Sequence, residues 1–189
     1  MNYAIVFRLL GYILLCEGAL LLLPAFTSLL YGEWMVLGVF LLTAAVSAGI
    51  GYALHTIKPR SKVFYMREGF AATSLCWVFI SVMGAVPFVL TGCIPNPVDA
   101  MFETVSGFTT TGASILPEVE NLAKGLLYWR SFTHWVGGMG VLVFLLAVAP
   151  SRGGGQGFTM HLLRAESPGP SVGKLVPKMR ETAAILYLL

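Results

Sequence analysis

Long apolar runs separated by short polar segments dominate this sequence. Each of the four longest provides the roughly 20 helical residues that cross a hydrocarbon core of about 30 Å. They lie at residues 4–30, 34–54, 70–90 and 126–148. A fifth apolar run begins after Glu181 and is too short to span before Leu189. We therefore expect the chain to stop inside a helix.

The segment at residues 91–124 is too long for a simple turn, and its middle is apolar enough to re-enter a membrane. Its beginning is typical of a helix amino terminus. Asn96 can cap, Pro97 suits the first helical position, and Asp99 places negative charge in the first turn. A helix over residues 97–108 would be about 18 Å long, which enters a bilayer without crossing it.

Residues 109–114, with the sequence Thr-Thr-Thr-Gly-Ala-Ser, predict a break from this short helix. Threonine side chains lose freedom in a helix, and Gly112 can take a positive φ at little cost. The chain can therefore reverse and return outward. Such runs also form ordinary turns, and the position between a capped half-length helix and a spanning helix is what favours a re-entrant loop here.

Irregular backbone at membrane depth is tolerated only where it is buried in protein or lines a water-filled cavity. Stacked backbone carbonyls can replace the hydration shell of a large monovalent cation such as potassium without binding it through a full charge. The negative end of the preceding helix dipole favours a cation at the same place. The pattern therefore indicates a carbonyl-lined path for a dehydrated cation.

Composition and charge agree with a membrane protein. The 189 residues are 57% hydrophobic and 11% charged, with a mean hydropathy of +0.79, whereas an ordinary soluble domain has about 25% charged residues. Lysine and arginine gather near the amino terminus, at residues 58–67 and at residues 151–180. The positive-inside rule places these three regions in the cytoplasm. The outer segment is acidic and would attract cations. Its carboxylates are Asp99, Glu103, Glu118 and Glu120.

Some residues in and beside the apolar runs allow two interpretations. Glu103 either hydrogen-bonds the amides of residues 109–114 from behind or points to outer water. Arg130 lies one helical turn before His134, and we favour an arginine that reaches the membrane interface over one that pairs within the protein. The glycines of the same run are favoured as positions of close helix packing rather than a hinge. They are Gly137, Gly138 and Gly140.

Residues 102–114, Phe-Glu-Thr-Val-Ser-Gly-Phe-Thr-Thr-Thr-Gly-Ala-Ser, resemble the first filter of the TrkH/TrkG/KtrB family of potassium uptake proteins. Residues 130–140, Arg-Ser-Phe-Thr-His-Trp-Val-Gly-Gly-Met-Gly, and residues 165–170, Ala-Glu-Ser-Pro-Gly-Pro, are also similar to the TrkH pattern. The resemblance covers essentially the whole chain. It implies an all-α integral membrane protein with a potassium-channel-like helix–pore loop–helix unit after two transmembrane helices.

The resemblance also implies a division of the chain and a set of site residues. Two transmembrane helices would occupy residues 1–57, the first of four pore units residues 63–150, a cytoplasmic connection residues 151–180, and a further helix would start at 181–189. Because a complete member has three further units, the resemblance implies that the chain is a fragment, a truncated gene product or a piece that assembles with copies or partners. The ion-lining carbonyls would belong to Thr109, Thr110, Thr111 and Gly112, with Ala113 at the edge. Potassium would be held at Thr110, Thr111 and Gly112, and Glu103 and Ser114 would support this filter.

The expected function is uptake of potassium, with the ion as substrate, symport as the transport class and no cofactor. The expected location is a bacterial inner membrane, crossed several times, with the amino terminus in the cytoplasm. The resemblance implies membrane lipid, a TrkA-like nucleotide-binding regulatory subunit and a second copy of the complete protein as partners, and no nucleic acid.

Two alternatives belong to other classes. A non-conducting membrane scaffold is compatible with a single pore unit, because one unit supplies only a quarter of each ion cage. An intramembrane serine hydrolase could use Ser106 as nucleophile and His134 as base. However, Thr104 stands where a G-x-S-x-G elbow requires glycine. We therefore expect no enzyme and assign no catalytic residue.

Overall fold

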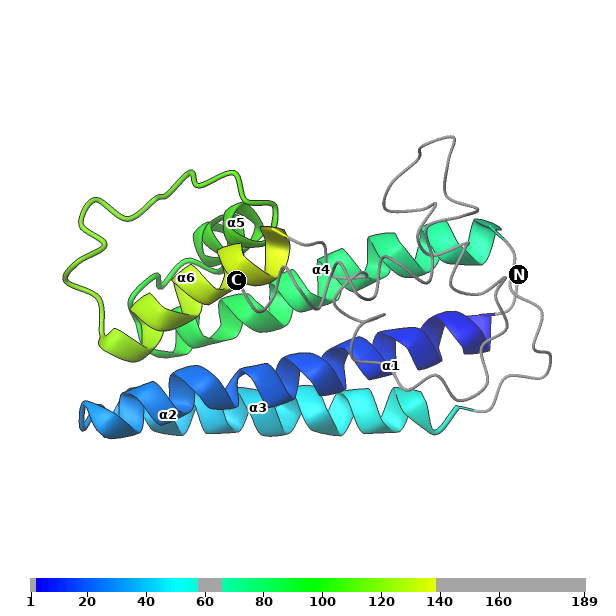
Figure 1. Cartoon of the computed structure of the whole chain (residues 1–189), viewed down its shortest axis with the longest axis horizontal. Helices are drawn as coiled ribbons and strands as arrows, with labels where there is room; N and C mark the ends of the chain where they lie inside the picture. The colour runs from blue at the N-terminus through cyan, green and yellow to red at the C-terminus, as the bar shows by residue number, and fades with distance from the viewer. Residues whose placement is uncertain (1–2, 58–65, 139–189) are drawn as a thin grey trace, which may run out of the picture.

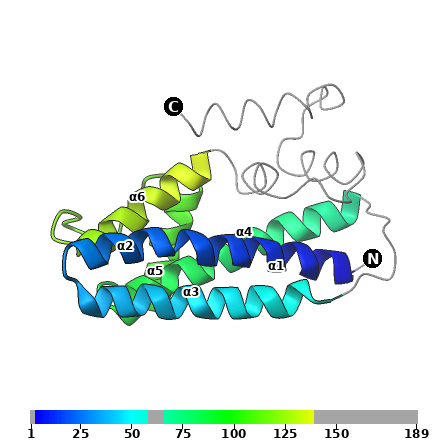
Figure 2. The same cartoon turned by 60° about the horizontal axis from the view of Figure 1, so that its bottom comes forward.

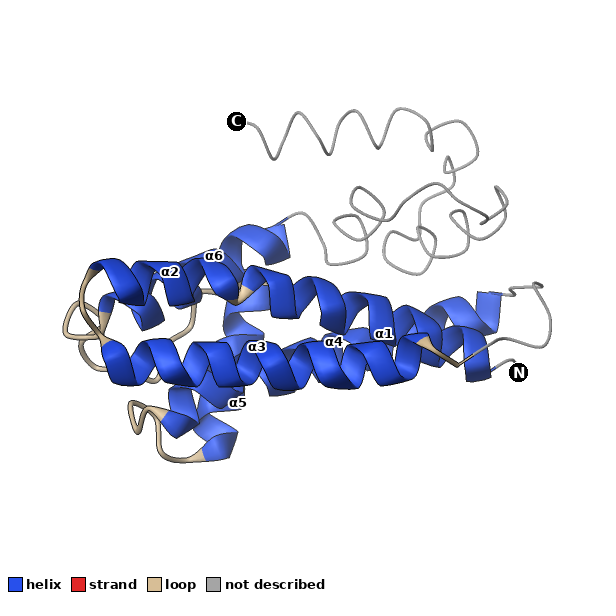
Figure 3. Ribbon diagram, turned by 90° about the horizontal axis from the view of Figure 1, so that it is seen from below, coloured by secondary structure: helices blue, strands red, loops and turns tan. Residues whose placement is uncertain are grey.

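The computed structural model describes residues 3–57 and 66–138. Within these ranges all regular secondary structure is helical, and there is no strand (Figure 3). The helices are α1 (Tyr3–Leu20), α2 (Leu22–Leu30), α3 (Trp34–His55), α4 (Met66–Leu90), α5 (Pro97–Phe108) and α6 (Lys124–Gly138). The predicted all-α membrane fold is confirmed.

Three stretches of the described residues are long and apolar enough to cross a membrane. They are Tyr3–Leu30, Trp34–His55 and Arg67–Leu90, and they match the first three predicted spans. The fourth predicted span coincides with α6 as far as Gly138. Its remainder lies outside the described residues, together with most of the predicted loop at 58–67, the connection at 151–180 and the helix start at 181–189.

The helices form a long hairpin with a shorter pair at one end. Helices α1 and α2 follow one another beside α3, and α4 lies along this hairpin (Figures 1 and 2). Helices α5 and α6 pack on each other, α5 also contacts α4, and α6 also contacts α2. The α2–α3 turn and the start of α6 lie at the end of the molecule opposite the amino terminus (Figure 1).

The first predicted span is not one uninterrupted helix, because α1 and α2 are separated at Leu21. Pro24 has no N–H to donate to the carbonyl of Leu20, and its ring crowds that carbonyl. The N–H of Leu21 still donates to the carbonyl of Glu17 at 2.9 Å, so the axis continues. The proline therefore separates the two helices without ending the span.

Small residues allow α1 and α3 to pack with their backbones close together. A Cβ added at Gly11 would lie 2.6 Å from the carbonyl oxygen of Gly51, and one added at Gly51 would lie 2.8 Å from that of Gly11. Further along the same two helices, a Cβ added at Gly18 would lie 3.0 Å from the carbonyl oxygen of Ala44. This packing of small residues is typical of membrane helices, which associate without help from the hydrophobic effect.

Trp129 of α6 joins four helices at the centre of the protein. Its side chain is 1% exposed, and its indole N–H donates to the carbonyl of Gly84 in α4 at 2.9 Å. The rings of Phe40 from α3 and Phe108 from α5 pack edge-to-face with the same indole. A buried indole N–H needs such an acceptor, so this contact fixes where α6 and the end of α5 lie relative to α4.

Candidate functional site

Helix α5 begins and ends where its sequence predicts. The side chain of Asn96 accepts the N–H of Val98 at 3.0 Å, Pro97 is the first helical residue, and Asp99 lies in the first turn. The cap satisfies one of the free amides at the helix start. The helix has 12 residues and ends at Phe108, so the predicted half-length helix over residues 97–108 is confirmed.

The chain leaves α5 through a Schellman motif with a threonine in its left-handed position. The N–H of Thr110 donates to the carbonyl of Gly107 at 2.9 Å, and the N–H of Thr111 donates to that of Ser106 at 3.0 Å. Thr110 has a φ of 56°, in the position where glycine is usual. Sequence reasoning missed this residue because a β-branched side chain is disfavoured at positive φ.

Gly112 provides the second left-handed residue, with a φ of 76° and open space where a Cβ would be. The predicted turn at Gly112 is therefore confirmed. The hydroxyl of Thr109 donates to the carbonyl of Val105 at 2.8 Å and lies 2.8 Å from the hydroxyl of Thr111. Residues 109–114 are all exposed, and the two left-handed residues turn the backbone away from the helix.

Residues 109–114 use their amides and carbonyls differently. The amides of Thr109, Thr110 and Thr111 donate back to α5. Among the described residues, no hydrogen bond uses the carbonyl oxygens of these threonines or of Gly112. The carbonyl of Ala113 differs, because it accepts the hydroxyl of Ser106 at 2.6 Å. The backbone therefore leaves four carbonyl oxygens without a hydrogen bond in the described structure, just beyond the negative end of a helix.

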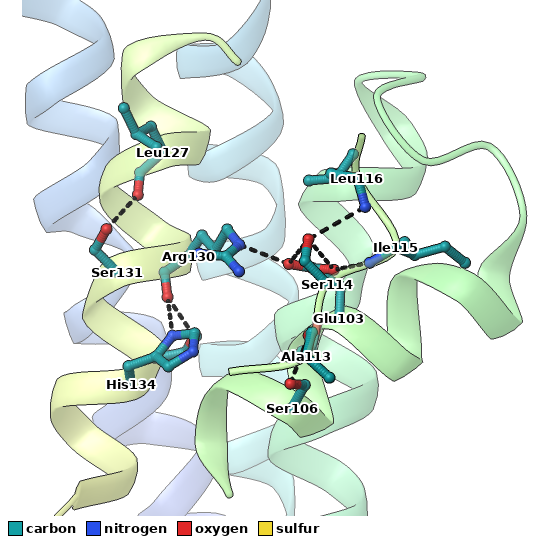
Figure 4. A network of polar contacts seen from close by, with 12 residues as sticks. Glu103, Ser106, Ala113, Ser114, Ile115, Leu116, Leu127, Arg130, Ser131 and His134 are labelled. Atoms are coloured by element: carbon teal, nitrogen blue, oxygen red, sulfur yellow. Dashed lines mark hydrogen bonds and ion pairs between the residues drawn. The ribbon is translucent and has the colours of Figure 1, made fainter. Parts of the chain in front are cut away.

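Glu103 holds the far side of this segment from inside α5 (Figure 4). Its side chain is buried, its Oε2 accepts the N–H of Ile115 at 2.9 Å, and the hydroxyl of Ser114 lies 3.0 and 3.1 Å from the two carboxylate oxygens. The N–H of Leu116 in turn donates to the Ser114 hydroxyl at 3.1 Å. Of the two interpretations of Glu103, the support from behind is the one observed. It reaches the Ser114 hydroxyl and the amide of Ile115, just after the segment, and not an amide within residues 109–114.

Arg130 pairs with Glu103, so the disfavoured of its two interpretations is the one observed. Its Nε lies 2.6 Å from Oε1 of Glu103 (Figure 4). The carboxylate is 1% exposed, and an unpaired buried charge is costly, so the neighbouring arginine turns inward. Burial, together with the negative charge of Glu103, raises the pKa of the Cys93 thiol above its ordinary value.

Helices α5 and α6 touch through glycines. A Cβ at Gly107 would overlap the side chain of Thr133, and one at Gly137 would overlap the carbonyl of Phe108. The packing interpretation is confirmed for Gly137. Gly138 makes no such approach, since the nearest atom to an added Cβ there is 4.0 Å away. Gly140 lies outside the described residues.

The proposed hydrolase pair is engaged elsewhere. The hydroxyl of Ser106 donates to the Ala113 carbonyl at 2.6 Å. His134 Nδ1 lies 2.9 Å from the carbonyl oxygen of Arg130, in its own helix. No group of three or more His, Cys, Asp or Glu side chains in the described ranges could hold a metal ion.

Fold and site together define a multi-pass helical membrane protein in which a half-length helix ends in a tethered, irregular segment. Four successive carbonyls of this segment have no hydrogen bond among the described residues. The family model TrkH, described as a cation transport protein, matches residues 36–189. The chain belongs to this family of cation transport proteins.

Several relatives align with the whole chain. A Trk system potassium uptake protein TrkH from Halomonas elongata is 34% identical over 194 residues, covering 100% of this chain and 39% of that protein. The TrkH of Escherichia coli K12 gives the same identity and the same coverage of both proteins. TrkG of that strain is 33% identical over 187 residues, covering 97% of this chain and 38% of its own length. The chain thus spans about two fifths of the relatives it matches. These relatives are named as transport proteins, which argues against the hydrolase.

Proposed function

We propose that this chain contributes one filter segment to a potassium uptake protein. The carbonyl oxygens of Thr109, Thr110, Thr111 and Gly112 face a dehydrated potassium ion, held chiefly at Thr110, Thr111 and Gly112, and Ala113 forms the edge. The observation that carries the proposal is that the threonine amides are bound back to α5 while all four carbonyls are without a hydrogen bond in the described structure.

The support behind the segment suits a site that binds by dipoles. Glu103 and Ser114 fix the backbone at residues 114–116, and Arg130 balances the charge of Glu103. Because the Glu103–Arg130 pair has no net charge, the ion interacts with carbonyl dipoles and with the end of α5. These bind a monovalent cation yet release it. A fully charged carboxylate at the same place would hold the ion more tightly and slow its passage.

One segment supplies only part of each ion cage, so the other oxygens come from further units. The relatives' names support potassium as the substrate. The division into residues 1–57, 63–150, 151–180 and 181–189 belongs to this proposal. The proposal also places the protein in a bacterial inner membrane with its amino terminus in the cytoplasm. It includes a TrkA-like regulatory subunit as a partner and a homodimer of the complete protein. The distribution of lysine and arginine supports the orientation.

Potassium-dependent growth of a strain without its own potassium uptake tests the filter. Gly112→Asp should abolish rescue by the gene product as encoded, because it places a charged side chain beside the carbonyls. Gly92→Asp is the matched control, since Gly92 has nearly the same φ, 74°, and equally open surroundings outside the segment. Rescue retained by Gly112→Asp would contradict the filter. Loss in both variants would indicate backbone strain instead.

A further inference from the structure

Glu33 connects two parts of the chain that are far apart in sequence. It lies in the turn between α2 and α3, and its two carboxylate oxygens accept the amides of Lys124 and Gly125 at 2.7 and 3.0 Å. These are the first two residues of α6. Such amides have no partner within their own helix, and a carboxylate there also complements the helix dipole. Glu33 therefore caps α6 from another hairpin.

At the same junction there is no room for a side chain at position 125, near the start of α6. A Cβ at Gly125 would overlap the hydroxyl of Ser28 and lie 3.2 Å from the carbonyl oxygen of Pro24. The Ser28 hydroxyl is itself held by that carbonyl at 2.9 Å, and Ser28 is fully buried. The start of α6 is thus seated directly on the backbone of α2 while Glu33 holds its amides.

What is fixed at the start of α6 reaches the site through the helix. Arg130 follows Gly125 by little more than one turn, and its Nε lies 2.6 Å from Glu103. Further along, Gly137 touches Phe108, the last residue of α5. A shift of α6 along its axis would move both contacts together, and charge-assisted hydrogen bonds tolerate little change in distance.

We propose that Glu33 is a positioning residue for the filter. By capping α6 it fixes the position of Arg130 along the helix axis relative to Glu103. Through Glu103 it also fixes the backbone of residues 114–116. The α1–α3 hairpin is then the seat that aligns the site, in addition to crossing the membrane. This inference rests on the proposed function for its effect on ions, whereas the cap itself is independent of that function.

The test uses the gene product as encoded and compares Glu33→Ala, Glu33→Gln and Glu120→Ala. Glu120 is an exposed carboxylate of the predicted outer segment at residues 91–124, so it controls for surface charge. Amide hydrogen exchange at the start of α6 should rise about fivefold in Glu33→Ala, the effect expected for loss of a helix cap. Glu33→Gln keeps one neutral acceptor and should show a smaller rise. Glu120→Ala should show none.

The second readout is the ratio of potassium to sodium uptake, which a change in protein amount does not alter. Glu33→Ala should lower this ratio severalfold, Glu33→Gln should lower it less, and Glu120→Ala should leave it unchanged. Unchanged exchange in Glu33→Ala would overturn the cap. Faster exchange with an unchanged ratio would overturn the positioning role. The filter proposal fails by a different result, growth retained in Gly112→Asp.

Discussion

At the scale of single residues, Glu103 combines three roles that are usually separate. It accepts a backbone amide from Ile115, a hydroxyl from Ser114 and the guanidinium of Arg130. With its side chain 1% exposed, none of these partners can be replaced by bulk water. The conformation of residues 114–116 therefore depends on a carboxylate in α5 and on an arginine in α6.

Arg130 and Glu103 should contribute to stability as a coupled pair and not independently. Arg130→Gln leaves Glu103 buried without its cation, so we expect a loss of about 3 kcal/mol of stability. The double variant Glu103→Gln/Arg130→Gln should lose less than the two single variants added together. Thermal unfolding of the purified protein in detergent measures this. Additive losses would mean that the two side chains do not interact.

Thr110 is the other exceptional residue, because it holds a positive φ without being glycine. Thr110→Gly should stabilise the protein by about 1 kcal/mol, since it relieves the left-handed strain of a β-branched residue. Thr109→Gly is the control. Thr109 has an ordinary φ of −85° and a side-chain bond to Val105, so its replacement should destabilise. If both variants melt at lower temperatures than the parent, the strain at Thr110 is not significant.

At the scale of elements, α6 is fixed at both of its described ends. Glu33 and Ser28 hold its start, whereas its far end lies against the last residues of α5. Between them, Trp129 attaches the helix to α4. Because glycines make the contacts at both ends, small side-chain changes there act on whole helices.

Neighbouring glycines in α6 should respond in opposite ways to the same substitution. Gly137→Ala places a methyl group against the carbonyl of Phe108, which is backbone and cannot rotate away, so α5 and α6 must separate and uptake should be lost. Gly138→Ala meets only an ordinary contact at 4.0 Å and gains up to about 1 kcal/mol of helix propensity. Growth rescue and thermal unfolding of both variants test the packing. Equal effects would contradict it.

At the scale of the whole molecule, the described helices place their connections at two ends. The amino terminus, the end of α3 and the start of α4 lie at one end, and the α2–α3 turn and the start of α6 at the other (Figure 1). With spans of 28, 22 and 24 residues between these ends, the two sets of connections lie on opposite sides of a membrane.

Labelling with a membrane-impermeant maleimide checks this arrangement. In a background where Cys16, Cys76 and Cys93 are replaced, Glu120→Cys should react in intact cells. Ile57→Cys, just after α3, should react only after the membrane is permeabilised. Both positions are exposed in the protein, so access depends on the membrane alone. Labelling of both in intact cells would contradict the topology.

Local chemistry explains what could be predicted from the sequence. The spans follow from the length of the apolar runs, and the start of α5 follows from the cap at Asn96 and the proline after it. The turn at Gly112 follows from the freedom of glycine. Each of these signals lies within a few residues of the feature that it predicts.

Tertiary structure alone decided which distant residues meet. Glu33 and Lys124 are 91 residues apart, and Glu103 and Arg130 are 27 apart. No local pattern specifies such pairs, because the partner of a charged side chain depends on which helix faces it after packing. Likewise, Thr110 takes a left-handed φ against its own propensity because the amides around it bond back to α5. The sequence by itself determined where the helices lie along the chain, whereas packing between them determined the contacts that hold the site.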